Sequence, residues 1–159
     1  LICYMQTKDY VISANRHLCV CKTLLNTITS ATPADKKCQI LCEIYYISGY
    51  IIESMLSYAV LSHFRVQGDV MDSEHLKNNS FKTHNLQKKV QYALEKKCNI
   101  KGITLLTQKG KYTQQELFRN WNVKYRYEKY CVLEKEKLNE YINTTENIYK
   151  QILSKYPLI

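Results

Sequence analysis

The sequence predicts an all-α protein, an up-and-down four-helix bundle with one short extra helix. Three observations favour this fold class. The chain is 45% apolar but holds only 4 Gly and 2 Pro, so little interrupts a helix. Apolar residues recur at helical spacing in four segments, and no segment shows the two-residue alternation of a strand. With 159 residues the chain is long enough to bury a core, and we expect one domain over 1–159.

The first two helices are predicted from an apolar stripe and from a long apolar run. The first covers 8–28, and its stripe consists of Val11, Leu18, Cys21, Leu24, Leu25 and Ile28. The second covers 33–64, with Thr32 as N-cap and Pro33 as the first helical residue. Because it is apolar on most sides, we expect it to be the central and most buried element.

The middle of the chain is predicted to be less regular. Residues 66–83 are polar and contain Gly68, which predicts a loop. A shorter amphipathic helix follows over 84–98, and 99–112 is a connector with two glycines. Thr113 and Glu116 have the spacing of a capping box, which predicts a short helix into Phe118.

The last helix is predicted from two apolar rows that step by sevens, a spacing that suits packing in a bundle. Pro157 is expected to end this helix. The rows are Cys131, Leu138, Thr145 and Ile152, and Tyr127, Tyr141 and Ile148.

One carboxylate interrupts the apolar stretch 45–64 of the second helix. Glu53 follows Gly49 by four residues and precedes Ser57 by four, so the three share one stripe. A buried charge needs a partner, and the candidate cations are Arg16, His17 and Arg126. We expect an arginine to fit best, because its guanidinium can bond both carboxylate oxygens. Two interpretations stay open: an ion pair that fixes helix register, or a polar pocket for a phosphate or nucleotide.

Four stretches resemble a known family. They are "SANRHLCVCKTLL", "YYISGYIIESMLSYAV", "THNL" and "LFRNWNVKYRYE", which carry Arg-His, Gly-Tyr-x-x-Glu, His-x-Leu and Trp-x-x-x-x-Arg-Tyr. In this order they resemble the prokaryotic subgroup of HEPN domains (higher eukaryotes and prokaryotes nucleotide-binding). The resemblance implies a helical bundle that usually dimerises. It also implies roles in RNA cleavage, toxin–antitoxin systems or phage defence, or in partnership with nucleotidyltransferase-like proteins.

The chain departs from the ribonuclease members of that family, which carry an Arg followed four to six residues later by a His. Arg16 is followed at once by His17, Arg65 precedes His75 by ten residues, and Arg119 and Arg126 have no His after them. The usual ribonuclease mechanism is therefore not expected. An enzyme remains the alternative only if a site is rebuilt from Arg16, His17, Arg126 and Glu53.

The candidate residues form a predicted polar cluster: Arg16, His17, Glu53, His84, Trp121, Arg126 and Tyr127. His17 is a general base or a packing residue. His84 is expected to cap or pack at a helix start. Trp121, with Tyr125 and Tyr127, either stacks on a base or plugs the end of the bundle.

Charge and cysteines bound the remaining choices. The net charge of +9 suits contact with phosphates or describes a merely solvated surface. The runs "EKEKLNE" and "KKVQYALEKK" are interpreted as solvated faces. Seven Cys without an apolar leader predict reduced thiols in the cytoplasm. Cys38 and Cys42 are one helical turn apart, but two more zinc ligands are lacking, so we expect no metal and no cofactor.

Together these features predict a non-catalytic, HEPN-like module that binds nucleotide or RNA, acts as a homodimer, and serves a toxin–antitoxin or defence system. Two alternatives are an RNase toxin with a rearranged active site and a purely structural partner of a nucleotidyltransferase. No membrane association is expected.

Overall fold

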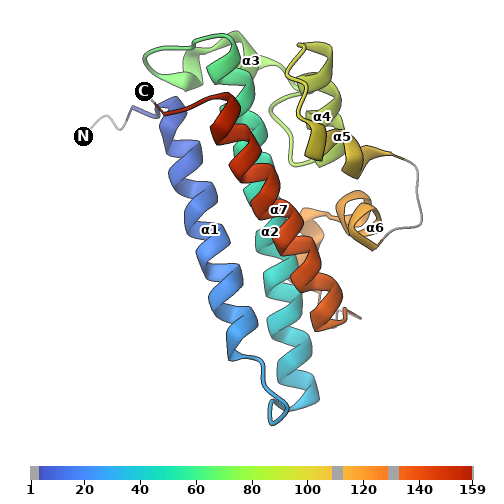
Figure 1. Cartoon of the computed structure of the whole chain (residues 1–159). Coiled ribbons are helices and arrows are strands. Elements are labelled where there is room, and N and C mark those ends of the chain that lie inside the picture. The colour runs from blue at the N-terminus through green and yellow to red at the C-terminus, as the bar shows by residue number, and fades with distance from the viewer. Residues whose placement is uncertain (1–3, 109–112, 129–132, 159) are drawn as a thin grey trace.

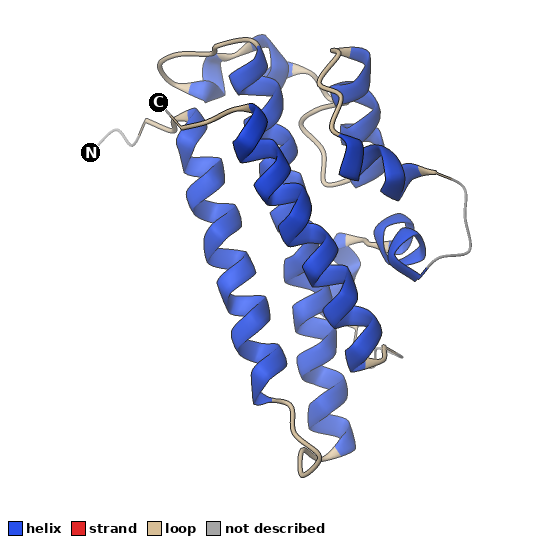
Figure 2. Ribbon diagram, in the orientation of Figure 1, coloured by secondary structure: helices blue, strands red, loops and turns tan. Residues whose placement is uncertain are grey.

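The structure is a computed structural model that describes residues 4–108, 113–128 and 133–158, and every regular element within these ranges is helical (Figure 2). The all-α prediction is confirmed. Three long helices, α1 (Thr7–Thr27), α2 (Ala34–His63) and α7 (Lys135–Lys155), pack along one another. Figure 1 shows that α2 and α7 run in the same direction and α1 runs in the opposite one.

Three shorter helices flank this group on the side of α2 and α7 away from α1 (Figure 1). They are α4 (Leu86–Glu95), α5 (Lys101–Thr107) and α6 (Thr113–Asn120). Helix α4 contacts α2, while α5 and α6 contact α7 and each other. Three short helices stand where one shorter helix, a connector and one short extra helix were expected, and the four-helix arrangement stays a prediction.

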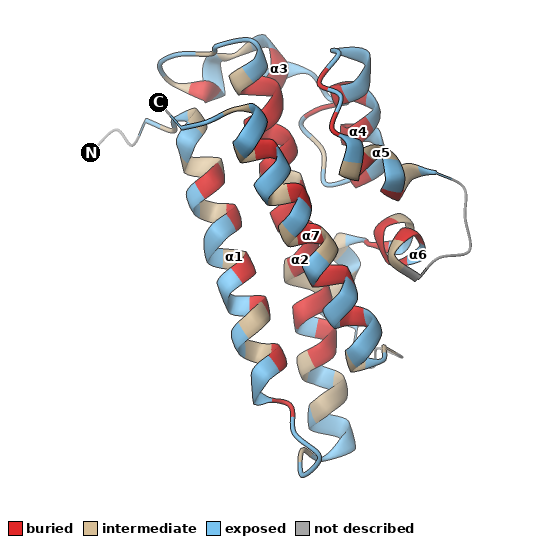
Figure 3. Ribbon diagram, in the orientation of Figure 1, coloured by how far each residue is buried: buried red, intermediate tan, exposed pale blue. Residues whose placement is uncertain are grey.

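Helix α2 is the most buried element, as predicted (Figure 3). Ile44, Ile51 and Leu56 have no exposed surface. By length and composition alone α2 could also cross a membrane, but 72% of its apolar window is buried inside the protein. Burial against the neighbouring helices accounts for its apolar character. The predicted stripe of α1 faces this core, with Leu24 only half-buried.

The predicted start of the second helix is wrong by one residue. Pro33 is the N-cap, and the helix begins at Ala34. The Thr32 hydroxyl accepts a hydrogen bond from the Thr29 amide at 2.9 Å, so it closes the preceding turn instead of capping the helix.

The predicted loop over 66–83 contains two helical turns, η1 (Val70–Asp72) and α3 (Glu74–Lys77). Each is capped by a side chain: Asp69 accepts from the Met71 amide at 3.1 Å, and Ser73 accepts from the Leu76 amide at 3.3 Å. The segment is anchored to the core by the buried side chains of Val70, Leu76 and Phe81. Residues 66–83 are therefore ordered and cover one end of the core.

The predicted connector after Asn99 contains α5, because Gly102 serves helix packing and not a turn. A Cβ there would lie 2.9 Å from Cγ1 of Ile148 on α7, and the Gly102 amide donates to Oε1 of Gln151 at 3.1 Å. The glycine lets α5 approach α7 closely.

The last helix begins later than its apolar rows suggested. Tyr127 belongs to a separate 3₁₀ helix, η2 (Val123–Tyr127), and α7 begins at Lys135. Cys131 lies outside the described residues, as does the side chain of Thr113 in the predicted capping box. The helix ends at Lys155, two residues before Pro157. The other members of both rows are buried: Leu138, Tyr141, Thr145, Ile148 and Ile152.

Two core tyrosines predict opposite effects of removing a hydroxyl. The Tyr45 hydroxyl donates to the Leu117 carbonyl at 2.6 Å, whereas the fully buried Tyr141 hydroxyl has no partner among the described residues. We expect Tyr141→Phe to raise the free energy of unfolding by about 1 kcal/mol and Tyr45→Phe to lower it by about 1 kcal/mol. Urea denaturation measures both; a loss of stability in Tyr141→Phe would show that this hydroxyl is bonded.

Candidate functional site

The candidate site is centred on Tyr50 in the middle of α2. Four rings surround it, with centroid distances of 6.0 Å to His17, 5.3 Å to Tyr46, 5.9 Å to His84 and 5.5 Å to Trp121. These rings come from α1, α2, the start of α4 and the link between α6 and η2. The structure thus brings His17, His84 and Trp121 of the predicted cluster to one place.

The indole of Trp121 packs directly against Gly49. A Cβ at Gly49 would lie 1.8 Å from Cε2 of the indole, so only glycine fits beneath this ring. The Trp121 Nε1–H donates to the carbonyl oxygens of Tyr45 and Tyr46 at 3.0 and 3.1 Å. With 6% of its surface exposed, Trp121 is a packing residue that fixes the end of α6 against α2, and its ring is not available to stack on a base.

Tyr50 and Tyr46 form a hydroxyl pair at the surface of α2, with their oxygens 3.0 Å apart. Burial is the main cause that raises the pKa of Tyr50 above its usual range, and the bond with Tyr46 adds to it. The Tyr50 phenol therefore stays neutral at physiological pH, and either hydroxyl can be the donor in this pair.

Glu53 pairs with a histidine and not with an arginine. His84 Nδ1 lies 2.8 Å from Oε2 of Glu53, so the expected arginine partner is wrong. The carboxylate keeps 18% of its side-chain surface exposed, and His84 keeps 62%. Ser57, on the same stripe, donates to the Glu53 backbone carbonyl within the helix and does not meet the carboxylate.

His84 does not cap α4, contrary to one of the roles expected for it. The N-cap is Asn85, whose side chain accepts from the Lys88 amide at 3.0 Å. This leaves the His84 ring free to turn back onto α2, where it meets Glu53 and the edge of Tyr50.

Lys89 is a buried cation that sequence reasoning missed, because its segment was interpreted as a solvated face. Its side chain is 3% exposed, and its ammonium donates to the Phe81 carbonyl at 2.9 Å and lies 4.4 Å from the centre of the Phe81 ring. Burial lowers the pKa of Lys89 to about 8, and the negative charge of Glu53 opposes part of that shift. Glu53 thus has two basic groups near it, His84 and Lys89, both from the α4 segment.

A signal for Lys89 is present in the sequence. Leu86, Lys89, Val90 and Ala93 follow the spacing i, i+3, i+4 and i+7, and all four are buried. Helical periodicity therefore puts this lysine on the apolar stripe, while the neighbouring Lys88 is exposed.

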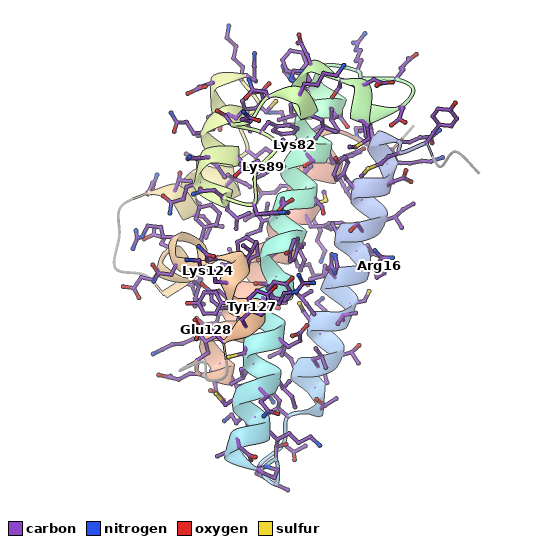
Figure 4. The ribbon with its side chains drawn as sticks, turned by 180° about the vertical axis from the view of Figure 1, so that it is seen from behind. Arg16, Lys82, Lys89, Lys124, Tyr127 and Glu128 are labelled. Carbon is purple, nitrogen blue, oxygen red and sulfur yellow. The ribbon has the colours of Figure 1, made fainter. Side chains whose placement is uncertain are left out.

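Two further residues of the predicted cluster line the exposed edge of the site. Arg126 and Tyr127 lie on η2, where Tyr127 is 78% exposed. The Tyr46 phenol is the main cause that raises the pKa of Arg126, followed by a hydrogen bond with Tyr127. Arg16 is exposed on α1, and Figure 4 shows it on the opposite side of α2 from Tyr127. Burial and the charge of Arg16 lower the pKa of His17.

A pocket of about 400 Å³ opens beside the cluster, between the start of α4 and the link from α6 to η2. His84 and Trp121 are part of its wall, and Gln87 crosses it by donating to the Arg119 carbonyl at 3.0 Å. Arg119 also lines it, and the other polar side chains around it are amides and one hydroxyl: Asn85, Asn120, Asn122 and Thr83. Such a wall can bind a polar ring or a phosphate by hydrogen bonds.

Comparisons with known proteins add no relative: no family model, curated protein or solved structure matches the chain. The HEPN resemblance therefore stays an expectation. Among the described residues, no three His, Cys, Asp or Glu side chains gather where they could hold a metal ion.

The contact between Gly49 and Trp121 predicts a strong effect of adding a single methyl group at position 49. In an ordinary helix Gly→Ala stabilises by about 1 kcal/mol, but we expect Gly49→Ala to destabilise by about 3 kcal/mol because the new Cβ overlaps the indole. Urea denaturation tests this. The matched variant is Gly49→Ala combined with Trp121→Val, in which the methyl group should cost much less; equal costs in both backgrounds would contradict the contact.

Lys89 predicts a pH-dependent difference in stability. The unfolded lysine titrates near 10.4, so the folded protein loses this proton first, and burial of the charge costs stability fully below pH 8 and progressively less up to about pH 10.5. We expect the stability of Lys89→Met relative to wild type to fall by on the order of 3 kcal/mol across this range. Urea denaturation at pH 7 to 10.5 measures it, with the exposed Lys88→Met as control. A constant difference would mean that the Lys89 ammonium reaches water.

Proposed function

We propose that this chain is a HEPN-like, four-helix-type module that binds nucleotide or RNA without cleaving it. In this proposal it acts in the cytoplasm as a homodimer within a toxin–antitoxin or defence system. One observation carries the proposal: residues that the resemblance singles out far apart in the sequence are in direct contact. Gly49 packs against Trp121, and Glu53 binds His84. Motif residues that meet in this way favour a shared site over a chance resemblance.

The chemistry of the surrounding face supports a ligand with phosphates. Arg16, Lys82 and Lys124 are exposed on the side of the molecule that Figure 4 shows, Arg126 is exposed on η2, and the whole chain carries a net charge of +9. Exposed cations of this kind neutralise a phosphate backbone without reading its sequence. Tyr127 adds an exposed ring, the type of surface on which an unpaired base stacks. Single-stranded RNA is the ligand that fits both features.

A second candidate function is RNA cleavage, and the Glu53–His84 pair is the observation that favours it. Glu53 holds Nδ1 of His84, which orients the ring, and most of the histidine side chain is exposed. A carboxylate that orients a histidine in this way is a common arrangement for a general base. In this version His84 takes the role that the sequence first suggested for His17.

Binding to a labelled single-stranded RNA tests the proposal. We expect the affinity to fall steeply as salt rises, and Arg126→Ala to weaken binding about fivefold and to reduce the salt dependence by about one counterion. Fluorescence anisotropy at several salt concentrations measures both. The control is Lys150→Ala on α7, which removes the same charge from a lysine that pairs with Glu146.

The same samples on a denaturing gel separate the candidates. Intact RNA with wild type supports a binding module, whereas cleavage that disappears in His84→Ala supports the enzyme. Absence of RNA binding in wild type would refute both and leave the structural partnership with a nucleotidyltransferase.

A further inference from the structure

A cavity of about 770 Å³ lies at one end of the three long helices, away from Tyr50. It opens to solvent and is bordered by the start of α1 and the ends of α2 and α7. Three cations line it: Lys8, Arg65 and Lys155. No carboxylate side chain is among its described lining residues. A cavity of this size suits a small ligand, and its charge suits an anion.

Arg65 occupies a backbone position that normally takes glycine. Its φ of 52° is left-handed, the Arg65 amide donates to the Ser62 carbonyl at 3.1 Å, and the Val66 amide donates to the Leu61 carbonyl at 2.9 Å. These two bonds are the Schellman ending of a helix, whose left-handed residue is usually Gly because a Cβ is strained there. An arginine at this point disagrees with the local backbone preference, and its side chain lines the cavity.

Lys8 also stands where local energetics disfavour it. It lies in the first turn of α1, where the partial positive charge of the helix repels a cation. Neither Lys8 nor Arg65 has a carboxylate partner within the described part of the chain, where the ion-paired lysines are Lys22, Lys137 and Lys150. Two residues that are locally unfavourable thus line the same cavity.

The third cation, Lys155, is held in place. Its ammonium donates to the Asn99 carbonyl at 2.6 Å and lies 5.5 Å from the centre of the Tyr156 ring. Two of its three N–H groups remain for a ligand. The Ser62 hydroxyl lines the same wall and offers a neutral hydrogen bond, while the Thr7 hydroxyl already donates to the Val66 carbonyl at 3.3 Å.

We propose that this cavity binds a small ligand that carries a pyrophosphate group, such as a nucleoside diphosphate. Three cations balance the roughly three negative charges of a pyrophosphate at neutral pH, and the volume leaves space for an attached group. The site is separate from the cluster around Tyr50 and does not depend on the proposed RNA binding.

Arg65→Gly tests the site because it separates binding from folding. Glycine suits the left-handed backbone, so the variant should be at least as stable as wild type in urea, yet it should bind inorganic pyrophosphate about tenfold more weakly by titration calorimetry. Lys97→Gly is the matched control. Lys97 ends α4 in the same left-handed conformation, with a φ of 62°, and does not line the cavity.

The titrations with pyrophosphate can support or overturn the proposed site. Binding by wild type and by Lys97→Gly, with about tenfold losses in Arg65→Gly and in Lys8→Gln, supports the site. The site would be overturned if wild type gave no heat of binding or if Arg65→Gly bound pyrophosphate as tightly as wild type. It would also be overturned if Lys97→Gly lost as much affinity as Arg65→Gly, because that result means diffuse attraction to a basic protein. Inorganic phosphate that binds as tightly as pyrophosphate would overturn the assignment of a pyrophosphate group.

Discussion

The contact between Gly49 and Trp121 is the constraint on which the site depends. The indole lies directly on the backbone of α2, and its Nε1–H is shared by two carbonyl oxygens of that helix. This fixes the end of α6 and the beginning of η2 against the middle of α2. The positions of Tyr50, Arg126 and Tyr127 relative to one another follow from this single close approach, which a larger residue at position 49 would prevent.

The charge in α2 is accommodated differently from what its apolar neighbours suggest. Glu53 is surrounded by apolar sequence, but its carboxylate is near the edge of the helix packing and keeps contact with water. A partly hydrated carboxylate does not need the two-pronged bond of an arginine. One histidine nitrogen suffices as a direct partner, and the buried ammonium of Lys89 contributes at longer range.

The long elements could be predicted from the sequence because their stripes are local patterns. The apolar positions of α1, α2 and α7 recur with helical spacing over many turns, and the structure buries them. The shorter helices α4 and α6 were also predicted, from an apolar stripe and a capping box, but η1, α3 and α5 could not be, because tertiary contacts decide them. Gly102 has the sequence appearance of a turn, yet it lies inside α5 because Ile148 and Gln151 stand beside it.

The same distinction applies to the site. That Glu53, His84 and Trp121 belong together was predicted from the resemblance, and the structure brings them together. Which basic group meets the carboxylate depends on how α4 is placed along α2, and no local pattern specifies that. The burial of Lys89 was missed although it follows a local pattern, since its spacing with Val90 and Ala93 puts it on the apolar stripe of α4.

The packing of the Trp121 indole against α2 also affects the fluorescence of the protein. The chain contains one tryptophan, and it is this one. Its intrinsic fluorescence therefore reports on a single seam of the molecule, without contributions from other tryptophans. A red shift of the emission would signal that water has entered between α6 and α2, even while the long helices remain intact and the circular dichroism is unchanged.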